Sequence, residues 1–328
     1  MIFRHSAALL ALALLSATPA VAASSQASVF DQLQENVWYL RTTDKAARLY
    51  VTSIGKGAPV VFLHGGPGND FNYFVDALMP HLAQNKFILF DQRGSLLSPV
   101  GDAKIPDLKL QQLVDDLEAL RVATGQDKMV LLGHSFGSYL ALSYYEQHPD
   151  HVRSLILTGA FNPSGKLMDA VHAMRARQQA LQSRPAIAAQ LKKEGLPDDA
   201  SKDTPQQSEA RWRITQFVPM NVIDMGKWRQ AQGAEVYYNK DVDDAIGDSL
   251  PAELDIVPTL KAHPVPITVI QGDQDYVDPG AQMWKALAAT ADGKTVKVDV
   301  IPNATHYSWI DDPQDFSRAL DEGLARVR

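Results

Sequence analysis

The stretch from residue 128 to residue 142 constrains the fold of this chain more than any other part of the sequence. Met129 to Leu132 is an apolar run of strand length, residues 133–137 read G-H-S-F-G, and the residues that follow have apolar side chains at helical spacing. A serine on a sharp turn between a buried strand and a helix has a strained backbone, and the flanking glycines leave room for neighbouring elements. The pattern therefore predicts Ser135 as a nucleophile, with the backbone N–H of Phe136 as an oxyanion donor.

Short apolar runs alternate with helical patterns on both sides of this stretch. Further runs of strand length lie at residues 37–42, 49–54, 59–63, 87–90, 152–157, 267–270 and 296–301. Helical periodicity is found at residues 71–82, 108–123, 283–289 and 313–327. Strands that alternate with helices predict an α/β fold with a mostly parallel, doubly wound sheet.

This alternation stops between residues 162 and 264. The segment contains helical patterns and several aromatic side chains, but no apolar run typical of a buried strand. Because the chain then returns to a strand, we interpret the segment as an inserted helical cap and not as a second, independent domain. The predicted organisation is a core of residues 23–161, a cap of residues 162–264, and the rest of the core in residues 265–328.

The first residues have the pattern of a secretory signal peptide. A short basic start is followed by an apolar run from Ala7 to Leu15, which is too short to span a bilayer, and then by a small-residue cleavage signal, Ala20-Val21-Ala22. We predict a signal peptide of residues 1–22, with cleavage after Ala22, or alternatively after Ala23. The expected location is therefore periplasmic or secreted, without a stable membrane anchor.

Charge and composition narrow the classes of function. The net charge is −7, which offers no basic surplus for a nucleic-acid backbone, and the chain has no cysteine for a thiol nucleophile or a cysteine metal site. His148 and His151 stand without an H-E-x-x-H motif, so we predict no metal and no cofactor. The expected partner is a small-molecule or short-peptide substrate.

A serine nucleophile needs a base and an acid, and both are expected in loops after later strands. Asp275 follows the predicted strand at residues 267–270, and His306 follows the last predicted strand. The order Ser135, Asp275, His306 fits a nucleophile–acid–base triad. Asp273 is an alternative acid, but the longer spacing from the strand favours Asp275.

A glycine-rich loop, His64-Gly65-Gly66-Pro67-Gly68, follows the predicted strand at residues 59–63. Backbone N–H groups of such a loop can bind an oxyanion, and we predict Gly66 as the second donor besides Phe136. A phosphate-binding loop would need a following Lys-Ser/Thr pair, which is missing.

Together these motifs resemble the α/β-hydrolase superfamily across the predicted mature chain. The pair H-G-G-P-G (64–68) and D-Q-R-G (91–94), with Ser135, Asp275 and His306, resembles more narrowly the proline iminopeptidase family of serine aminopeptidases. The resemblance implies a Ser–His–Asp triad, an acyl-enzyme intermediate and release of N-terminal proline or other residues from short peptides. The turn around Ser135 departs from the family's usual G-G-S-W-G and is more like that of esterases.

The same resemblance implies acidic cap residues that hold the free amino group of the substrate. Glu209, near Trp212, and Glu235 are the candidates in this sequence, although both could instead be solvated cap carboxylates. One alternative function is a carboxylesterase or related acyl hydrolase with the same triad and an apolar pocket formed by Trp212, Phe217 and Trp228. Another is a binding protein that keeps the fold without catalysis.

Overall fold

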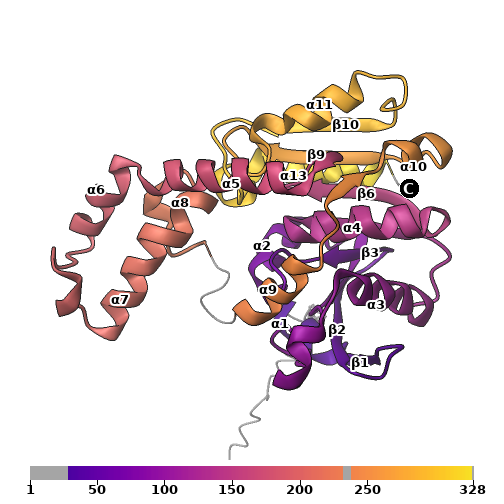
Figure 1. Cartoon of the computed structure of the whole chain (residues 1–328), viewed down its shortest axis with the longest axis horizontal. Helices are drawn as coiled ribbons and strands as arrows, with labels where there is room; N and C mark the ends of the chain where they lie inside the picture. Colours follow the sequence, from indigo (N-terminus) through magenta and orange to yellow (C-terminus); the bar gives the residue numbers. More distant parts are fainter. Residues whose placement is uncertain (1–28, 232–237, 327–328) are drawn as a thin grey trace, which may run out of the picture.

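A computed structural model describes residues 29–231 and 238–326, so the predicted signal peptide lies outside the described residues. An eight-stranded sheet forms the centre, with the order β1-β2-β4-β3-β5-β6-β9-β10 (Figure 1). Its strands are β1 (Trp38–Arg41), β2 (Arg48–Gly55), β3 (Ala58–Leu63), β4 (Asn85–Phe90), β5 (Met129–His134), β6 (Val152–Thr158), β9 (Ile267–Gly272) and β10 (Val296–Ile301). The pairs β1–β2 and β2–β4 are antiparallel and all other pairs are parallel, which confirms the predicted mostly parallel sheet.

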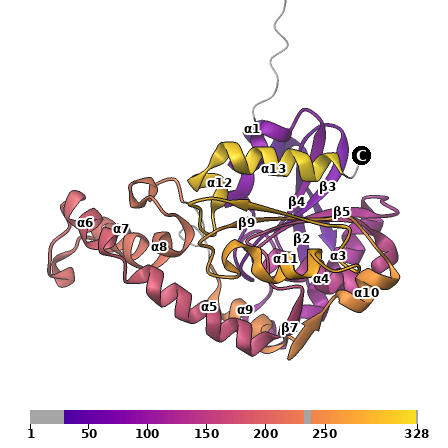
Figure 2. The same cartoon turned by 90° about the horizontal axis from the view of Figure 1, so that it is seen from above.

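Side chains along each strand alternate between two buried clusters, one on each face of the sheet. Helices cover both clusters, as expected for a mostly parallel sheet. In β3, Val61 and Leu63 pack into one cluster and Val60 and Phe62 into the other. The first cluster is covered by α3 (Leu110–Ala123), α4 (Phe136–Gln147), α10 (Val257–Ala262) and α11 (Gln282–Ala288). The second is covered by α1 (Val29–Glu35), α2 (Val75–Leu78), α12 (Ser308–Asp311) and α13 (Pro313–Ala325), and Figure 2 shows α13 on the side of the sheet opposite α4.

The helix expected over residues 71–82 is present, but it is not a regular α-helix throughout. This segment forms two 3₁₀ turns, Asn72–Phe74 and Met79–His81, on either side of the single turn α2. Pro80 lacks a backbone N–H and lies near the start of the last 3₁₀ turn, a position in a helical turn that tolerates proline. The aromatic side chains of this segment are nevertheless buried against the sheet.

Within the described ranges, residues 162–264 contribute no strand to the eight-stranded sheet. They form α5 (Leu167–Gln182), α6 (Pro185–Lys193), α7 (Pro205–Trp212), α8 (Val218–Asn221) and α9 (Lys240–Asp248) in addition to α10. Helices α6 and α7 project away from the sheet in both views (Figures 1 and 2). The short strands β7 (Ser164–Lys166) and β8 (Glu253–Asp255) pair antiparallel where the segment leaves the core and where it returns.

None of the helices in the described ranges combines the length and the apolar character needed to cross a membrane.

Candidate active site

Ser135 lies on a sharp turn between β5 and α4. Its backbone has φ 53° and ψ −122°, a conformation that costs free energy in a residue other than glycine. The turn is packed so closely that a Cβ atom at Gly137 would lie 2.0 Å from the carbonyl oxygen of Leu63. Glycine is therefore required at position 137, and the strand–turn–helix context predicted around Ser135 is present.

His306 and Asp275 lie together in the loops that follow β10 and β9. Nδ1 of His306 is 3.0 Å from both carboxylate oxygens of Asp275, and both residues are buried. A carboxylate only accepts hydrogen bonds, so the proton of neutral His306 is on Nδ1 and the lone pair is on Nε2. Nε2 is buried and has no hydrogen-bond partner within the described part of the chain. The pair can thus present a base to a neighbouring hydroxyl group.

Asp273, the alternative acid, does not contact His306. Its carboxylate is exposed and accepts a hydrogen bond from the backbone N–H of Ala304, 3.2 Å away. This contact ties the loop after β9 to the loop after β10. The structure therefore brings Asp275, and not Asp273, to the histidine.

Tyr276 also belongs to the site, although the sequence analysis did not identify it. Its ring packs against the ring of His306, with centroids 4.5 Å apart, and its hydroxyl group interacts with the side chains of Ser135 and Gln178. Burial raises the pKa of Tyr276, so the hydroxyl group stays protonated near neutral pH. Its only sequence signal is its position directly after Asp275.

The glycine-rich loop is held against the turn of Ser135 by a buried tyrosine. The backbone N–H of Gly65 donates a 2.7 Å hydrogen bond to the hydroxyl oxygen of Tyr73, which lies 2.7 Å from Nδ1 of His134. The tyrosine oxygen accepts from Gly65, and its hydroxyl proton can be donated to Nδ1 of His134 when the imidazole carries its own proton on Nε2. Burial lowers the pKa of His134 well below its usual value, which keeps this imidazole neutral.

The two motifs H-G-G-P-G and D-Q-R-G are linked through His64. The backbone N–H of Gln92 donates to Nε2 of His64 over 3.0 Å, and the Gln92 side chain donates to the His64 carbonyl oxygen over 2.8 Å. Burial lowers the pKa of His64 to about 4, so Nε2 can accept at neutral pH. Through these two hydrogen bonds, the D-Q-R-G segment holds the glycine-rich loop in place.

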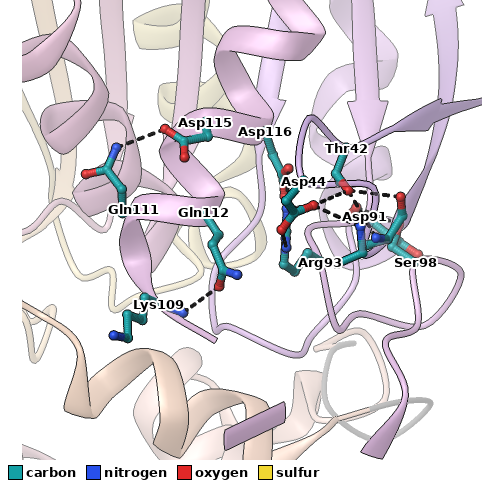
Figure 3. Close-up of polar contacts among 12 residues, drawn as sticks. Thr42, Asp44, Asp91, Arg93, Ser98, Lys109, Gln111, Gln112, Asp115 and Asp116 are labelled. Carbon is teal, nitrogen blue, oxygen red and sulfur yellow. Dashed lines mark hydrogen bonds and ion pairs between the residues drawn. The ribbon is translucent and has the colours of Figure 1, made fainter. Parts of the chain in front are cut away.

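Arg93 of the same segment forms an ionic cluster with the buried Asp116 and the exposed Asp44 (Figure 3). Its guanidinium group donates to both carboxylate oxygens of Asp116 over 2.8 and 2.7 Å, and to Asp44 over 2.6 and 3.3 Å. The guanidinium group holds the pKa of Asp44 well below its usual range. This cluster joins the β1–β2 turn, the loop after β4 and helix α3, and its residues do not line the cavity that contains Ser135.

A cavity of about 650 Å³ opens beside Ser135 and His306. Gly66 and Phe136, the two predicted oxyanion donors, both line it. One wall is a face of α5 that carries Leu167, Met168, Val171, Met174, Arg175 and Gln178. Another wall is helix α9, which contributes Asp243, Asp244, Gly247 and Asp248. The cavity thus combines a mainly apolar wall with an acidic one.

The comparisons with known proteins agree with this architecture. A family model described as the alpha/beta hydrolase fold matches residues 58–313. The chain belongs to the α/β-hydrolase family.

Among curated relatives of this α/β-hydrolase, a proline iminopeptidase from Xylella fastidiosa strain Temecula1 is 40% identical over 122 residues, which are 36% of this chain and 38% of the relative. A proline iminopeptidase from Arabidopsis thaliana is 40% identical over 119 residues, or 34% of this chain and 30% of the relative. These matches span well under half of the relatives' length.

Solved structures match over most of the chain. A proline iminopeptidase-related protein from Thermus thermophilus has a TM-score of 0.63 at 24% identity and covers 89% of this chain and 97% of its own. An esterase from Thermogutta terrifontis has a TM-score of 0.58 at 22% identity and covers 89% of this chain and 98% of its own. At this identity the likeness shows the fold alone.

The predicted cap residues Glu209, Trp212 and Trp228 do not line the cavity of this α/β-hydrolase. Glu209 is exposed on α7, and Trp212 is 44% exposed at the end of the same helix, where its ring stacks on that of Phe217. Only Phe217 of the predicted apolar pocket reaches the cavity, while Trp228 packs beneath Arg229. Helix α7 projects away from the sheet, which the spacing in sequence could not reveal (Figure 1). Glu235 lies outside the described residues.

A cluster of possible metal ligands in this α/β-hydrolase lies outside the cavity. Ligand atoms of Glu118, His148 and His151 all lie within 4.8 Å of one another. However, the Glu118 carboxylate already accepts from Arg121 over 2.7 and 2.9 Å, and this cation lowers the pKa of Glu118 to about 2. The same carboxylate also accepts from the Tyr144 hydroxyl group over 2.6 Å and lies 3.1 Å from Nδ1 of His151. The cluster fits a hydrogen-bond network better than a metal centre.

Proposed function

We propose that this α/β-hydrolase is a serine hydrolase that acts through an acyl-enzyme. Ser135 attacks the scissile carbonyl carbon while Nε2 of His306 takes the hydroxyl proton, and Asp275 holds the imidazole in the required tautomer. The backbone N–H groups of Phe136 and Gly66 stabilise the oxyanion. His306 then returns the proton to the leaving group, and a water molecule hydrolyses the ester to Ser135 by the same steps.

The chemistry needs a short path for the proton from Ser135 to His306. In the structure the Tyr276 hydroxyl interacts with the Ser135 side chain, and Nε2 of His306 has no partner among the described residues. Catalytic hydrogen bonds commonly tighten only when substrate is bound. The proposed mechanism therefore includes a rotation of the serine hydroxyl group towards Nε2 when a substrate enters.

Within this class we propose an aminopeptidase that releases N-terminal proline or other residues from short peptides. The observation that carries this proposal is the acidic wall of the cavity formed by α9. Asp243 is half-buried there, accepts a hydrogen bond from Tyr238 over 2.8 Å, and forms no ion pair within the described residues. Burial raises the pKa of Asp243, and a protonated substrate amine would supply the missing countercharge. The names of the relatives support the choice of proline.

An esterase remains the second candidate. The α5 wall presents methionine and other apolar side chains to the cavity, and such a wall suits an acyl chain or an alcohol without charge. The two candidates share the same triad and differ in whether a free amino group is required.

We further propose that the protein is exported, with residues 1–22 as a cleaved signal peptide. The support is the basic start, the short apolar run and the small residues at positions 20–22. Mass spectrometry of the N-terminus of protein recovered outside the cytoplasm would test it, and a mature N-terminus other than residue 23 or 24 would contradict the cleavage site.

Two substrates separate the candidates. A proline anilide with a free amino group reports aminopeptidase activity, and a short-chain acyl ester reports esterase activity, with Ser135→Ala as the control. We expect cleavage of the anilide that is lost when its amino group is blocked. Turnover of the ester alone would select the esterase. Absence of labelling by a fluorophosphonate probe would favour a binding protein.

The amine site is tested by a matched pair of variants on α9. Asp243→Asn removes the carboxylate at the cavity, and we expect kcat/KM for the anilide to fall about 10- to 100-fold, as for the loss of a charge-assisted hydrogen bond. Asp241→Asn removes the same charge from an exposed position that does not line this cavity. Equal effects of both substitutions would contradict a specific amine site.

A further inference from the structure

Helix α5 forms one wall of the cavity and reaches the residues of the proposed triad. Gln178 links this helix to the proposed triad, because its side chain interacts with the hydroxyl group of Tyr276. The same hydroxyl group also interacts with the side chain of Ser135. Arg175 lies three residues earlier on the same face, and both side chains line the cavity. Three residues advance an α-helix by about 4.5 Å, so Arg175 stands about one turn beyond the reacting groups.

Arg175 is the only lysine or arginine among the described residues that line this cavity. Its side chain is exposed, and within the described ranges it forms neither an ion pair nor a hydrogen bond with another residue. The neighbouring Arg177 differs, because its guanidinium group donates to the carbonyl oxygens of Tyr276 and Val277 over 3.1 and 2.8 Å. Arg177 therefore holds the loop after β9, whereas Arg175 offers its donors to the cavity.

The acidic and basic groups of the cavity are carried by two helices that are attached to different loops of the site. Helix α9 is attached to the glycine-rich loop, since the backbone N–H of Asn239 donates to the Gly68 carbonyl oxygen over 2.9 Å. Helix α5 is attached to the loop of the triad acid through Arg177. Figure 1 shows α5 above and α9 below. Both helices line the cavity, so we expect a substrate there to meet the carboxylates of α9 and the guanidinium group of α5.

We propose that Arg175 binds the C-terminal carboxylate of a short peptide, so that the substrates are di- and tripeptides with both ends free. This inference rests on the proposed aminopeptidase function, in which the α9 carboxylates receive the amino group. The planar guanidinium fork matches a carboxylate through two parallel hydrogen bonds, whereas a neutral amide end cannot form a charged pair. Arg175 is then a specificity-determining residue and takes no part in bond cleavage.

The proposal also limits the length of the substrate. Each additional residue moves the carboxylate up to about 3.6 Å further from the scissile bond. One helical turn along α5 therefore accommodates one or two residues after the cleaved bond. Longer peptides would carry their carboxylate past Arg175 and place a neutral peptide group there instead.

The test compares a Pro-Gly dipeptide with its C-terminal amide, using the full-length mature protein. The quantity measured is the ratio of kcat/KM for the free acid to kcat/KM for the amide. We expect a ratio of about ten or more at low ionic strength, falling as salt is added, because the site is open to solvent. Arg175→Gln should bring the ratio close to one, and Arg175→Lys should give an intermediate value because it keeps the charge without the fork.

Lys193→Gln is the matched control, since it removes a positive charge from an exposed position on α6 outside the cavity. This variant should keep the ratio of the unchanged protein. A ratio near one in the unchanged protein, together with cleavage of the dipeptide, would overturn the role of Arg175 and leave the aminopeptidase function intact. Failure to cleave the dipeptide, its amide and the proline anilide, with ester turnover retained, would overturn both proposals.

Discussion

The hydroxyl oxygen of Tyr73 lies 2.7 Å from Nδ1 of His134, and through this contact the glycine-rich loop and the turn of Ser135 form one buried hydrogen-bonded unit. Tyr73→Phe keeps the ring, which stacks on Tyr307, but removes the hydroxyl group. The N–H of Gly65 and Nδ1 of His134 then lose their partner. We expect kcat to fall about tenfold or more with a smaller change in KM, because the loop that carries the Gly66 donor is no longer fixed.

The same substitution should lower the free energy of unfolding by about 1–3 kcal/mol, as for other buried polar groups that lose a partner. Tyr39→Phe serves as the control, since Tyr39 is 50% exposed on β1. Steady-state kinetics and urea unfolding give the two values. A loss of stability with kcat unchanged would show that Tyr73 supports the fold without positioning the loop.

Asp275 and Asp273 provide a direct test of the triad. Asp275→Asn keeps the shape of the side chain but can donate to Nδ1 of His306, which favours the wrong tautomer, and we expect kcat to fall about 10⁴-fold. Asp273→Asn changes an exposed carboxylate that accepts a hydrogen bond from Ala304, and kcat should stay within about threefold of the unchanged protein. The reverse order of effects would assign the acid to Asp273.

Gly159 lies against the proposed base. Its backbone φ is 54°, and a Cβ atom there would lie 2.6 Å from Cε1 of His306. Gly159→Ala should displace the imidazole and reduce kcat/KM by about 100-fold or more, since small misplacements of catalytic groups have effects of this size. Gly125→Ala imposes similar backbone strain at φ 67° with no atom within 4 Å of the added Cβ, so it should affect stability but not activity.

Asp91 should make stability depend on pH in an unusual direction. Burial raises the pKa of Asp91 to about 7 in the folded chain, above its ordinary value of 3.8. Between these values the folded state binds more protons than the unfolded state, so the free energy of unfolding falls as pH rises from about 4 to about 7. The change attributable to this group is roughly 1.4 kcal/mol for each pH unit in that window.

Asp91→Asn mimics the neutral side chain and can still accept the 2.9 Å hydrogen bond from the backbone N–H of Leu97. We expect this variant to match the unchanged protein near pH 4 and to exceed its stability near pH 8. Urea unfolding at both pH values measures the difference. Parallel pH profiles for the two proteins would show that Asp91 does not titrate in this range.

The sheet could be predicted from the sequence because its strands are short apolar runs. Residues 59–63 and 129–132 have few polar side chains, as expected for strands buried on both faces, and they form β3 and β5. The helix expected at residues 71–82 is present as helical turns from residue 72 to residue 81, but apolar spacing does not distinguish 3₁₀ turns from an α-helix. The sequence does not predict helix α1, since its seven residues are too few to give a clear period.

The positions of Ser135, Asp275 and His306 could be predicted because the carboxyl ends of parallel strands meet at one edge of the sheet. The cavity-lining residues of the predicted cap could not be identified in this way. Which side chains of an inserted helix face the cavity depends on how the helices pack, so the sequence offers no physical reason to prefer Asp243 over Glu209. Tyr73 could not be linked to His134 either, because the two residues are 61 positions apart and no local pattern connects them.

His306 follows β10, the strand at the open edge of the sheet, while Ser135 follows the more central β5. The middle residues of β10 are only partly buried, and edge strands with few buried contacts open more readily than central ones. Local fraying at this edge would carry the imidazole away from a serine whose turn is still intact. On mild heating, therefore, the protein would lose its activity while most of its secondary structure persisted, and it would regain activity on cooling as soon as one strand returned to its place.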